Sequence, residues 1–480
     1  MGLRGAFRAD GSSGKTIPTN AKNDTRMLHD NVPASLFEGL FEKQLVAVFD
    51  AEQRTSNAGI PLLAALDHKL GLTKSLVACF VDPRDSSRIE HTYDSLFRQR
   101  VFSIALGCPD GNDAAHLGHD PALLTACGQR PDAARGLGSQ PTLSRFEHSI
   151  TGRELVNAGR ALEDVVVQRL RKRHARARRI FIDLDPTVDP THGQQAFAYF
   201  NGHYDTWCYL PMMGFLSIDG EPEQHLFHAR LRAGTVKEVK GTPAMLRRIV
   251  GKLRIAFKSA KLCVRLDAGF ACPQILDLLD ELKVEYMVAM GGNAVLGRLS
   301  GRHVNAAASL TSRFNTTTTF YGSDEYRAKS WAHKRRVIFK AEVVQAEGKS
   351  DRKNDRYVIT NLPQSAGHIW KLYCQRGDSE NRIKELKRDL AIDRTSCTRF
   401  LPNQLRVLMT AAAFVLFQEL RCCLADTSLR RAMVSTLRLR LLKVGATITR
   451  SARRIVMSMP TSHPWKDLWR LAAERVVAIA

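Results

Sequence analysis

Residues 373–387 read YCQRGDSENRIKELK, and this stretch governs how the rest of the chain is interpreted. Its polar residues follow the spacing Y-(2)-R-(3)-E-(6)-K and are Tyr373, Arg376, Glu380 and Lys387. On a helix, offsets of 3, 7 and 14 residues fall on one stripe. The adjoining stripe is apolar and consists of Ile383, Leu386 and Leu390. The pattern predicts a half-buried helix that presents one carboxylate between cations suited to phosphates. A solvated helix with i,i+4 ion pairs is the alternative.

Two further carboxylates stand at the ends of predicted strands. Residues 179–185 read RIFIDLD and residues 261–267 read KLCVRLD, which are short β-branched or alternating runs. They end at Asp185 and Asp267, and the carboxyl ends of strands are where open sheets place ligand-binding groups. Two such aspartates and one helix glutamate can bridge two cations about 3.5–4 Å apart, as in-line phosphoryl displacement requires. Magnesium suits this set because it takes few carboxylates and keeps sites for water and phosphate oxygens.

These motifs resemble those of bacterial insertion-sequence DDE transposases, in particular the insertion-sequence family thirteen-eighty group. The resemblance rests on D-x-T at 185–187, D-A-G-F at 267–270 and the Y-R-E-K spacing. It extends to residues 139–145, 189–193, 200–205 and 226–234, and covers roughly Phe49 to Arg421. Asp183 and Asp185 project from one face of the same strand, and the D-x-T register favours Asp185.

The resemblance implies a site and its partners. Asp185, Asp267 and Glu380 would be both the catalytic residues and the ligands of two Mg²⁺ ions, for which Mn²⁺ can substitute. The cations and phenol of the helix would contact DNA close to the scissile phosphate, and these are Tyr373, Arg376 and Lys387. The expected partners are the terminal inverted repeats of the element and target DNA, bound by a homo-oligomer on paired ends.

Composition favours a polyanionic partner. Lys and Arg number 71 against 48 Asp and Glu, which gives a net charge of +23. Such a field favours the phosphate backbone, although a basic protein without a nucleic-acid role is the alternative. The ten cysteines include no C-x-x-C pair, which indicates reduced thiols. No hydrophobic signal segment opens the chain, and the apolar stretch 408–417 is too short to span a bilayer. We therefore expect a cytoplasmic, nucleoid-associated prokaryotic protein that does not bind membranes.

The order of predicted elements indicates an α/β fold. Three antiparallel strands followed by alternating helices and strands are typical of a ribonuclease-H-like core. We expect this core to be interrupted by a β-rich insertion, preceded by a helical DNA-binding region and followed by a basic helical tail. The predicted segments are a poorly ordered 1–40, a helical region 41–168, the core in two parts at 169–290 and 366–425, the insertion 291–365 and the tail 426–480.

A capped helix near residue 140 is the candidate for reading DNA sequence. Ser139 is a predicted N-cap with Pro141 in the first turn. The helix start would expose Gln140, Thr142, Ser144 and Arg145, which suit base edges, although an ordinary surface helix fits equally well. Residues 169–179 add seven Lys and Arg that can grip phosphates or form a solvated connector. The tryptophans at 207, 331 and 370 can stack on unpaired bases or belong to the core.

The leading function is a transposase that cuts the ends of its element and joins them to target DNA. A metal-dependent DNA nuclease remains open, because hydrolysis and strand transfer use the same metal pair. A domesticated DNA-binding protein without catalysis is the third reading, disfavoured because all three acids are present. Inverted repeats bracketing the reading frame would favour the transposase.

Overall fold

The computed structural model describes residues 35–37, 45–47, 53–221, 223–345 and 350–479. The chain divides into two compact units, 1–52 and 53–480. In the first unit, β1 (Ser35–Phe37) and β2 (Leu45–Ala47) form an antiparallel pair. The predicted segment 1–40 lies outside the described residues except for β1. Everything that follows concerns the second unit.

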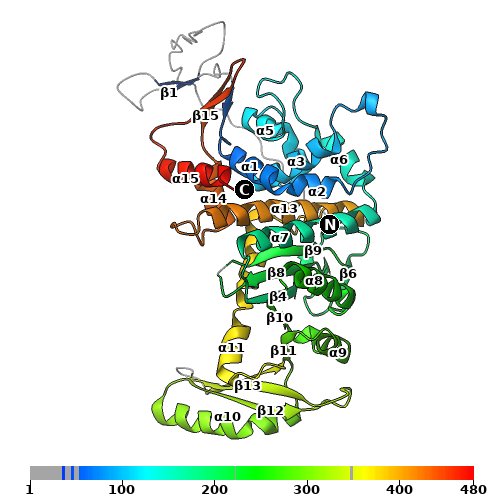
Figure 1. Cartoon of the computed structure of the whole chain (residues 1–480), viewed down its shortest axis with the longest axis vertical. Helices are drawn as coiled ribbons and strands as arrows, with labels where there is room; N and C mark the ends of the chain where they lie inside the picture. Colours follow the sequence, from blue (N-terminus) through cyan, green and yellow to red (C-terminus); the bar gives the residue numbers. More distant parts are fainter. Residues whose placement is uncertain (1–34, 38–44, 48–52, 222, 346–349, 480) are drawn as a thin grey trace, which may run out of the picture. The chain divides into compact units, whose positions relative to one another are not determined.

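A mixed sheet of eight strands forms the centre of this unit (Figure 1), in the order β12-β13-β14-β11-β10-β4-β8-β9. Its strands are β4 (Arg179–Pro186), β8 (Met212–Ile218), β9 (His225–Arg230), β10 (Lys261–Leu266), β11 (Glu285–Met290), β12 (Thr318–Tyr326), β13 (Arg335–Val344) and β14 (Arg352–Thr360). β4, β10 and β11 are mutually parallel, and their neighbours on both sides are antiparallel. The strands expected at the two aspartates are thus adjacent and parallel, which brings their carboxyl ends to one edge.

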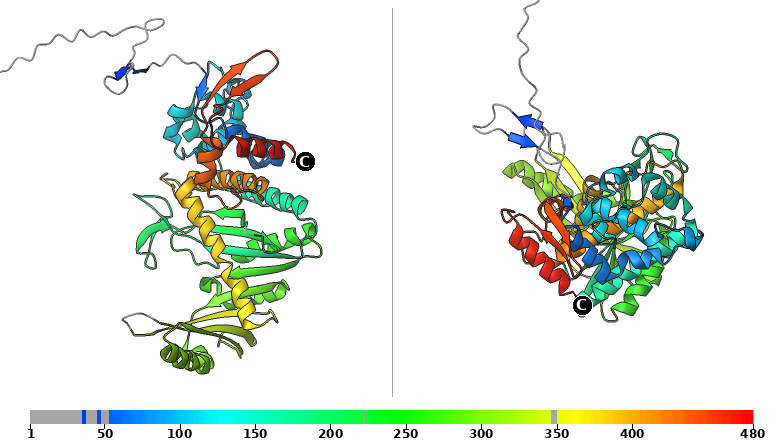
Figure 2. Two further views of the ribbon diagram at one scale, coloured as in Figure 1. Left: turned by 90° about the vertical axis from the view of Figure 1, so that its left-hand side faces the viewer. Right: turned by 90° about the horizontal axis from the view of Figure 1, so that it is seen from above.

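Helices cover both faces of the sheet. α8 (Thr242–Ala256) connects β9 to β10, and α9 (Pro273–Glu281) connects β10 to β11. On the other face, α11 (Ala366–Cys374) buries Ile369 against Phe181, Cys263 and Met287. Figure 2 shows α11 and the following α12 (Gly377–Leu390), in yellow, running along this face. Because strand side chains alternate, residues two and four beyond Phe181 lie on the α11 face too.

The expected helical region consists of short helices packed on one long one. Its helices are α1 (Ile60–Leu70), α2 (Leu72–Val77), α3 (Tyr93–Ala105), α4 (Ala114–Leu117), α5 (Pro121–Ala126), α6 (Gln140–Ser149) and α7 (Gly152–Arg173), with single turns η1 (Ser86–Arg88) and η2 (Gly111–Asp113). α13 (Phe400–Cys423) packs against α1, α3 and α6 on one side and, together with α7, against β9 of the sheet on the other (Figure 1). The predicted boundary at 168/169 falls inside α7, so one continuous helix joins the region to the core.

α13 is also the one helix of the described residues that is long and apolar enough to cross a bilayer. Within its most apolar window, 78% of the residues are buried inside the protein. A helix that is apolar on all sides and surrounded by other elements is a core helix.

The segment 291–365 is not simply a β-rich insertion. It begins with α10 (Ala294–Phe314), a helix of 21 residues, and its strands β13 and β14 extend the central sheet. Glycines and small polar residues obscured the helix in the sequence. Its buried residues nevertheless recur at helical spacing and are Leu296, Ser300, Val304, Ala307 and Thr311.

The predicted helical tail contains strands as well. After α14 (Val434–Leu437) and a π turn η4 (Arg438–Leu442), β15 (Ala446–Arg450) and β16 (Ile455–Ser458) form an antiparallel pair before α15 (Lys466–Val477). β15 also pairs with β3 (Arg54–Thr55), which ties the two ends of this unit together. The β-branched residues of TIT at 447–449 and IV at 455–456 favour strands, and the basic composition hid this signal.

The stretch 373–387 forms two helices rather than one. α11 ends at Cys374 and α12 begins at Gly377. At the junction, the N–H groups of Arg376, Asp378 and Ser379 donate to carbonyls three residues back instead of four. Gly377 weakens the helix at this point, because glycine has a poor helix propensity. The predicted burial of the apolar stripe is confirmed, since Ile383, Leu386 and Leu390 are all buried.

Candidate functional site

Asp185 lies at the carboxyl end of β4 and is buried, with 8% of its surface exposed. The side chain two residues earlier, Asp183, is fully buried and accepts two hydrogen bonds from the Arg265 guanidinium, at 2.7 and 2.6 Å. Arg265 pairs in register with Asp183 across the two parallel strands and also stacks on the Phe181 ring. Asp183 is therefore paired with Arg265, and Asp185 is the aspartate that lies at the carboxyl end of β4.

Asp267 directly follows β10 and occupies the equivalent place on the neighbouring strand. Its Oδ1 accepts a hydrogen bond of 2.9 Å from the N–H of Gly269, within the single turn η3 (Ala268–Phe270). A Cβ at position 269 would come within 3.0 Å of the Glu238 side chain and 3.2 Å of Asp267 Oδ1. Glycine in the D-A-G-F motif thus allows the turn to approach the carboxylate closely.

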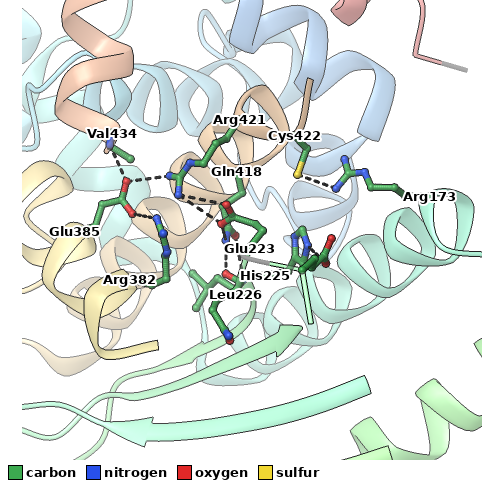
Figure 3. A network of polar contacts seen from close by, with 12 residues as sticks. Arg173, Glu223, His225, Leu226, Arg382, Glu385, Gln418, Arg421, Cys422 and Val434 are labelled. Carbon is green, nitrogen blue, oxygen red and sulfur yellow. Dashed lines mark hydrogen bonds and ion pairs between the residues drawn. The ribbon is translucent and has the colours of Figure 1, made fainter. Parts of the chain in front are cut away.

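Glu380 lies in the first turn of α12, which is anchored from its opposite face. Glu385 on that face is buried and accepts hydrogen bonds from Arg382 at 2.6 Å, Arg421 at 2.9 Å and the N–H of Val434 at 2.7 Å. Figure 3 shows these residues, with Arg421 between Glu385 and Glu223. The network joins α12 to α13 and to the C-terminal segment, and so fixes the helix that presents Glu380.

One guanidinium joins the three carboxylates. Arg376 Nη2 lies 3.0 Å from Asp185 Oδ1 and 3.7 Å from Asp267 Oδ2, and its Nη1 lies 3.2 Å from Glu380 Oε1. Arg376 is itself buried, with 8% of its surface exposed. The structure therefore gathers residues of β4, β10 and α12 around a single positive charge.

Burial shifts the protonation of the two aspartates. Burial raises the pKa of Asp185 to about 7, against the lowering effect of Arg376, and the Asp267 and Glu380 charges raise it further. Burial also raises the pKa of Asp267, again opposed by Arg376. One cation does not offset three acids, so the site favours either a proton or further positive charge.

The remaining residues expected at the site lie at different distances from the acids. Tyr373 is close, because its hydroxyl donates to the carbonyl of Leu266, the residue before Asp267, at 3.4 Å. Burial raises the pKa of this phenol to about 12. Lys387 lies near the far end of α12 and its Nζ donates to the Val188 carbonyl. Arg145 belongs to α6, in the helical region, and no contact joins it to the acids.

The α6 helix begins where the sequence predicts. Ser139 is its N-cap residue, and both Gln140 and Arg145 are exposed. The opposite face is fixed by Glu147, which is buried and accepts hydrogen bonds of 2.9 Å from Arg100 and from Arg406. Thr142 and Arg145 line a surface cavity of about 390 Å³.

Part of the basic run has a structural role. Arg169 and Arg173 donate to Glu419 of α13 at 2.9 and 2.5 Å, so these two cations are not available to DNA in this arrangement. The tryptophans differ from one another in how far they are buried. Trp331 is buried at 4% exposure, whereas Trp207 is 57% exposed.

Two polar residues near the acids were not expected from the sequence. Arg265 stands two residues before Asp267, as Asp183 stands two before Asp185, and this matched spacing on parallel strands could have indicated their pairing. Glu238 lies against Gly269 and raises the pKa of Asp267. Its surroundings in the sequence, VKEVK, give no signal of proximity to the site.

The family described as transposase DDE domain group 1 matches residues 37–479, and the chain belongs to this family. Its members act on DNA and generally use a divalent metal, so the chain is a transposase-type enzyme. A comparison with curated proteins gave no match.

Proposed function

We propose that this protein cuts the ends of an insertion sequence and joins them to target DNA, with Asp185, Asp267 and Glu380 as the catalytic acids. The observation that carries the proposal is the convergence of three carboxylates, from segments 82 and 113 residues apart, on one guanidinium. Acids gathered at one place, with burial raising the pKa of Asp185 and Asp267, are typical of a catalytic site.

The order of the central strands supports a ribonuclease-H-like core. Three antiparallel strands, β9, β8 and β4, are followed by the parallel β10 and β11, with the acids at the ends of β4 and β10. The strands β12 to β14 and helix α10 would then be the insertion that separates Asp267 from the glutamate helix. Together with the Y-R-E-K spacing, this supports membership of the insertion-sequence thirteen-eighty group.

The donor set fits Mg²⁺. The three groups are carboxylates, which are hard oxygen ligands, and a positive guanidinium already stands among them in place of a metal cation. Two Mg²⁺ ions held there would activate the attacking oxygen and stabilise the leaving oxygen. The aspartates at the sheet edge and Glu380 on its anchored helix would hold these ligands in place before DNA arrives.

Arg376 would exchange partners during this process. Without metal it pairs with the acids, and with metal bound its guanidinium would be free to hold a phosphate oxygen of the element end. Tyr373, beside it, would contact the same strand. Lys387 would act from the far end of α12, close to the Val188 carbonyl that it contacts.

End recognition would come from α6. Gln140 and Arg145 are exposed on this helix, and two arginines fix its inner face. The helix would therefore present a rigid surface to the major groove of DNA. A homo-oligomer would bring two ends together, and the exposed cations of 169–179 would add affinity without sequence preference.

Substitution of single acids tests the proposal. Asp185→Ala, Asp267→Ala and Glu380→Ala should each abolish cleavage of end-containing DNA in Mg²⁺, while binding to that DNA persists. Asp378→Ala is the matched control, because Asp378 is exposed on the same first turn of α12. Retained cleavage in Asp267→Ala would overturn the assignment. Joined products from precleaved ends would separate a transposase from a nuclease, which yields only hydrolysis.

A further inference from the structure

A second cluster of metal-ligand residues lies away from the three acids. His174, Glu221 and His225 place their ligand atoms within 4.8 Å of one another. Their ligand atoms are also close pairwise, since the two Glu221 oxygens lie 3.3 Å from His174 Nε2 and 2.8 Å from His225 Nε2. We propose that these three residues form a zinc site that fastens the end of α7 to the turn between β8 and β9.

The spacing of the donors fits a tetrahedral ion. Zinc binds imidazole nitrogen and carboxylate oxygen at about 2.0–2.2 Å, so ligands at neighbouring corners of a tetrahedron lie roughly 3.3 Å apart. The two N···O separations are 3.3 and 2.8 Å, and each involves a different oxygen of Glu221. The carboxylate must therefore turn so that one oxygen faces both imidazoles when zinc enters. The fourth position would be left to water.

The ligands come from segments that are already held in place. His174 is the C-cap of α7, and its N–H donates to Leu170 at 2.8 Å. Glu221 stands in a turn fixed by Asp219, whose carboxylate accepts hydrogen bonds from the N–H groups of Arg178 and Arg179. His225 opens β9 and lies beside the Gln418 and Glu223 network (Figure 3). Preformed ligand positions reduce the cost of ordering on metal binding.

Hydrogen bonding alone does not satisfy this cluster. His225, with 3% of its side chain exposed, has Glu221 as its partner. The Nε2 of His174 is buried and has no hydrogen-bond partner, although Glu221 lies near it. A buried polar atom without a partner is costly, and a cation between the three groups would satisfy it.

The chemistry of the donors separates this site from the acid site. Two imidazoles and one carboxylate suit zinc and its neighbours in the transition series, whereas three carboxylates suit magnesium. The sites are also distant. The turn that carries Glu221 is fixed at the first residues of β4, and Asp185 lies six residues further along that strand, roughly 20 Å away.

Zinc retention in excess magnesium tests the site. The full-length protein is stripped with a chelator, incubated with Zn²⁺, dialysed against buffer with excess Mg²⁺, and assayed for bound zinc. We expect one zinc ion per chain. His174→Gln and His225→Gln should each weaken zinc binding at least tenfold, since loss of merely a supporting group costs about 10–100-fold. His116→Gln, at an exposed histidine outside the cluster, is the control and should retain the ion.

Failure of the proposal would be visible without any activity assay. Wild-type protein that keeps no zinc, or His variants that keep as much as the control, would overturn it. If a variant does not fold, the visible absorption spectrum of wild-type protein loaded with Co²⁺ provides the test. A four-coordinate site with nitrogen ligands gives intense visible absorption, and its absence would equally refute the site.

Discussion

Replacement of Arg376 by Gln should make the stability of the protein depend more strongly on Mg²⁺. At 3.0 Å, the attraction between its guanidinium and Asp185 is about 5 kcal/mol at an effective dielectric constant of about 20, before desolvation is subtracted. Removal of one partner from a buried ion pair costs about 3–5 kcal/mol. We expect the lower figure, because the pKa of Asp185, already about 7, lets this acid accept a proton instead.

Magnesium should reverse part of that loss. In the wild type a metal ion must displace the guanidinium, whereas in Arg376→Gln it meets acids without a counter-ion. A tenfold tighter affinity would add about 1.4 kcal/mol to the stabilisation by Mg²⁺. Urea unfolding with and without Mg²⁺, at pH 8, above the pKa of about 7 of Asp185, measures both effects. At pH 6 the loss in the variant should be smaller, because Asp185 is then protonated in the folded state.

The control is Arg382→Gln, which also removes a cation from α12. Arg382 pairs with the buried Glu385, away from the three acids. Its loss should destabilise the protein equally with and without Mg²⁺. If Arg376→Gln also showed no dependence on Mg²⁺, or lost no stability without it, the guanidinium would not be the counter-ion of the site.

Three further predictions concern other parts of the protein. Burial raises the pKa of Asp189 to about 8. Ionisation of this group therefore lowers the stability of the protein by up to about 1.4 kcal/mol per pH unit as the pH rises from about 4 to 8. In urea titrations, Asp189→Asn should become more stable than the wild type across that range. Gly59→Ala should disrupt the contact between the two ends of the second unit, because a Cβ there would lie 1.7 Å from the Leu441 carbonyl oxygen. A lower melting temperature would show this disruption. Trp207→Ala should weaken binding of single-stranded DNA by about 1–3 kcal/mol per stacked base at unchanged stability, whereas Trp331→Ala should cost about 3–5 kcal/mol of stability.

The acids were predictable because strand geometry is simple. Side chains alternate with a period of two, and parallel strands end at the same edge, so short apolar runs ending in Asp185 and Asp267 predict neighbouring carboxylates. The same reasoning placed the strands near residues 180–185, 286–290 and 336–344, and the structure confirms them. The apolar stripe of α12 likewise predicted which face of the glutamate helix is buried.

Tertiary partners were less predictable than elements. The Y-R-E-K spacing puts four side chains on one stripe, but it does not say which of them points inward. Arg376 turns to the acids because the helix is interrupted beside it, and Lys387 meets a backbone carbonyl instead. The spacing of residues in the sequence does not indicate that Glu238 lies near Asp267, because only the folded chain brings these two residues together. The helix α10 was missed because its buried stripe includes Ser300 and Thr311, which do not register as apolar.

The balance of charge at the site predicts that Asp185→Asn should abolish DNA cleavage and yet raise the stability of the protein. Asp185→Asn keeps the shape of the side chain but removes one of three crowded charges, and Arg376 retains Asp267 and Glu380 as partners. Because the pKa of Asp185 is raised from 3.8 to about 7, ionisation of this group destabilises the folded state once the pH exceeds about 4, and the full cost is reached above pH 7.

Without divalent ions at pH 8, the variant should therefore unfold at a higher urea concentration than the wild type, and below pH 4 the two should converge. Mg²⁺ should stabilise the wild type and leave the variant nearly unchanged, since one ligand is lost. Cleavage of element ends should be absent in the variant. A variant no more stable than the wild type at pH 8 would mean that Arg376 already offsets the burial of Asp185, and that the acids are held together without strain.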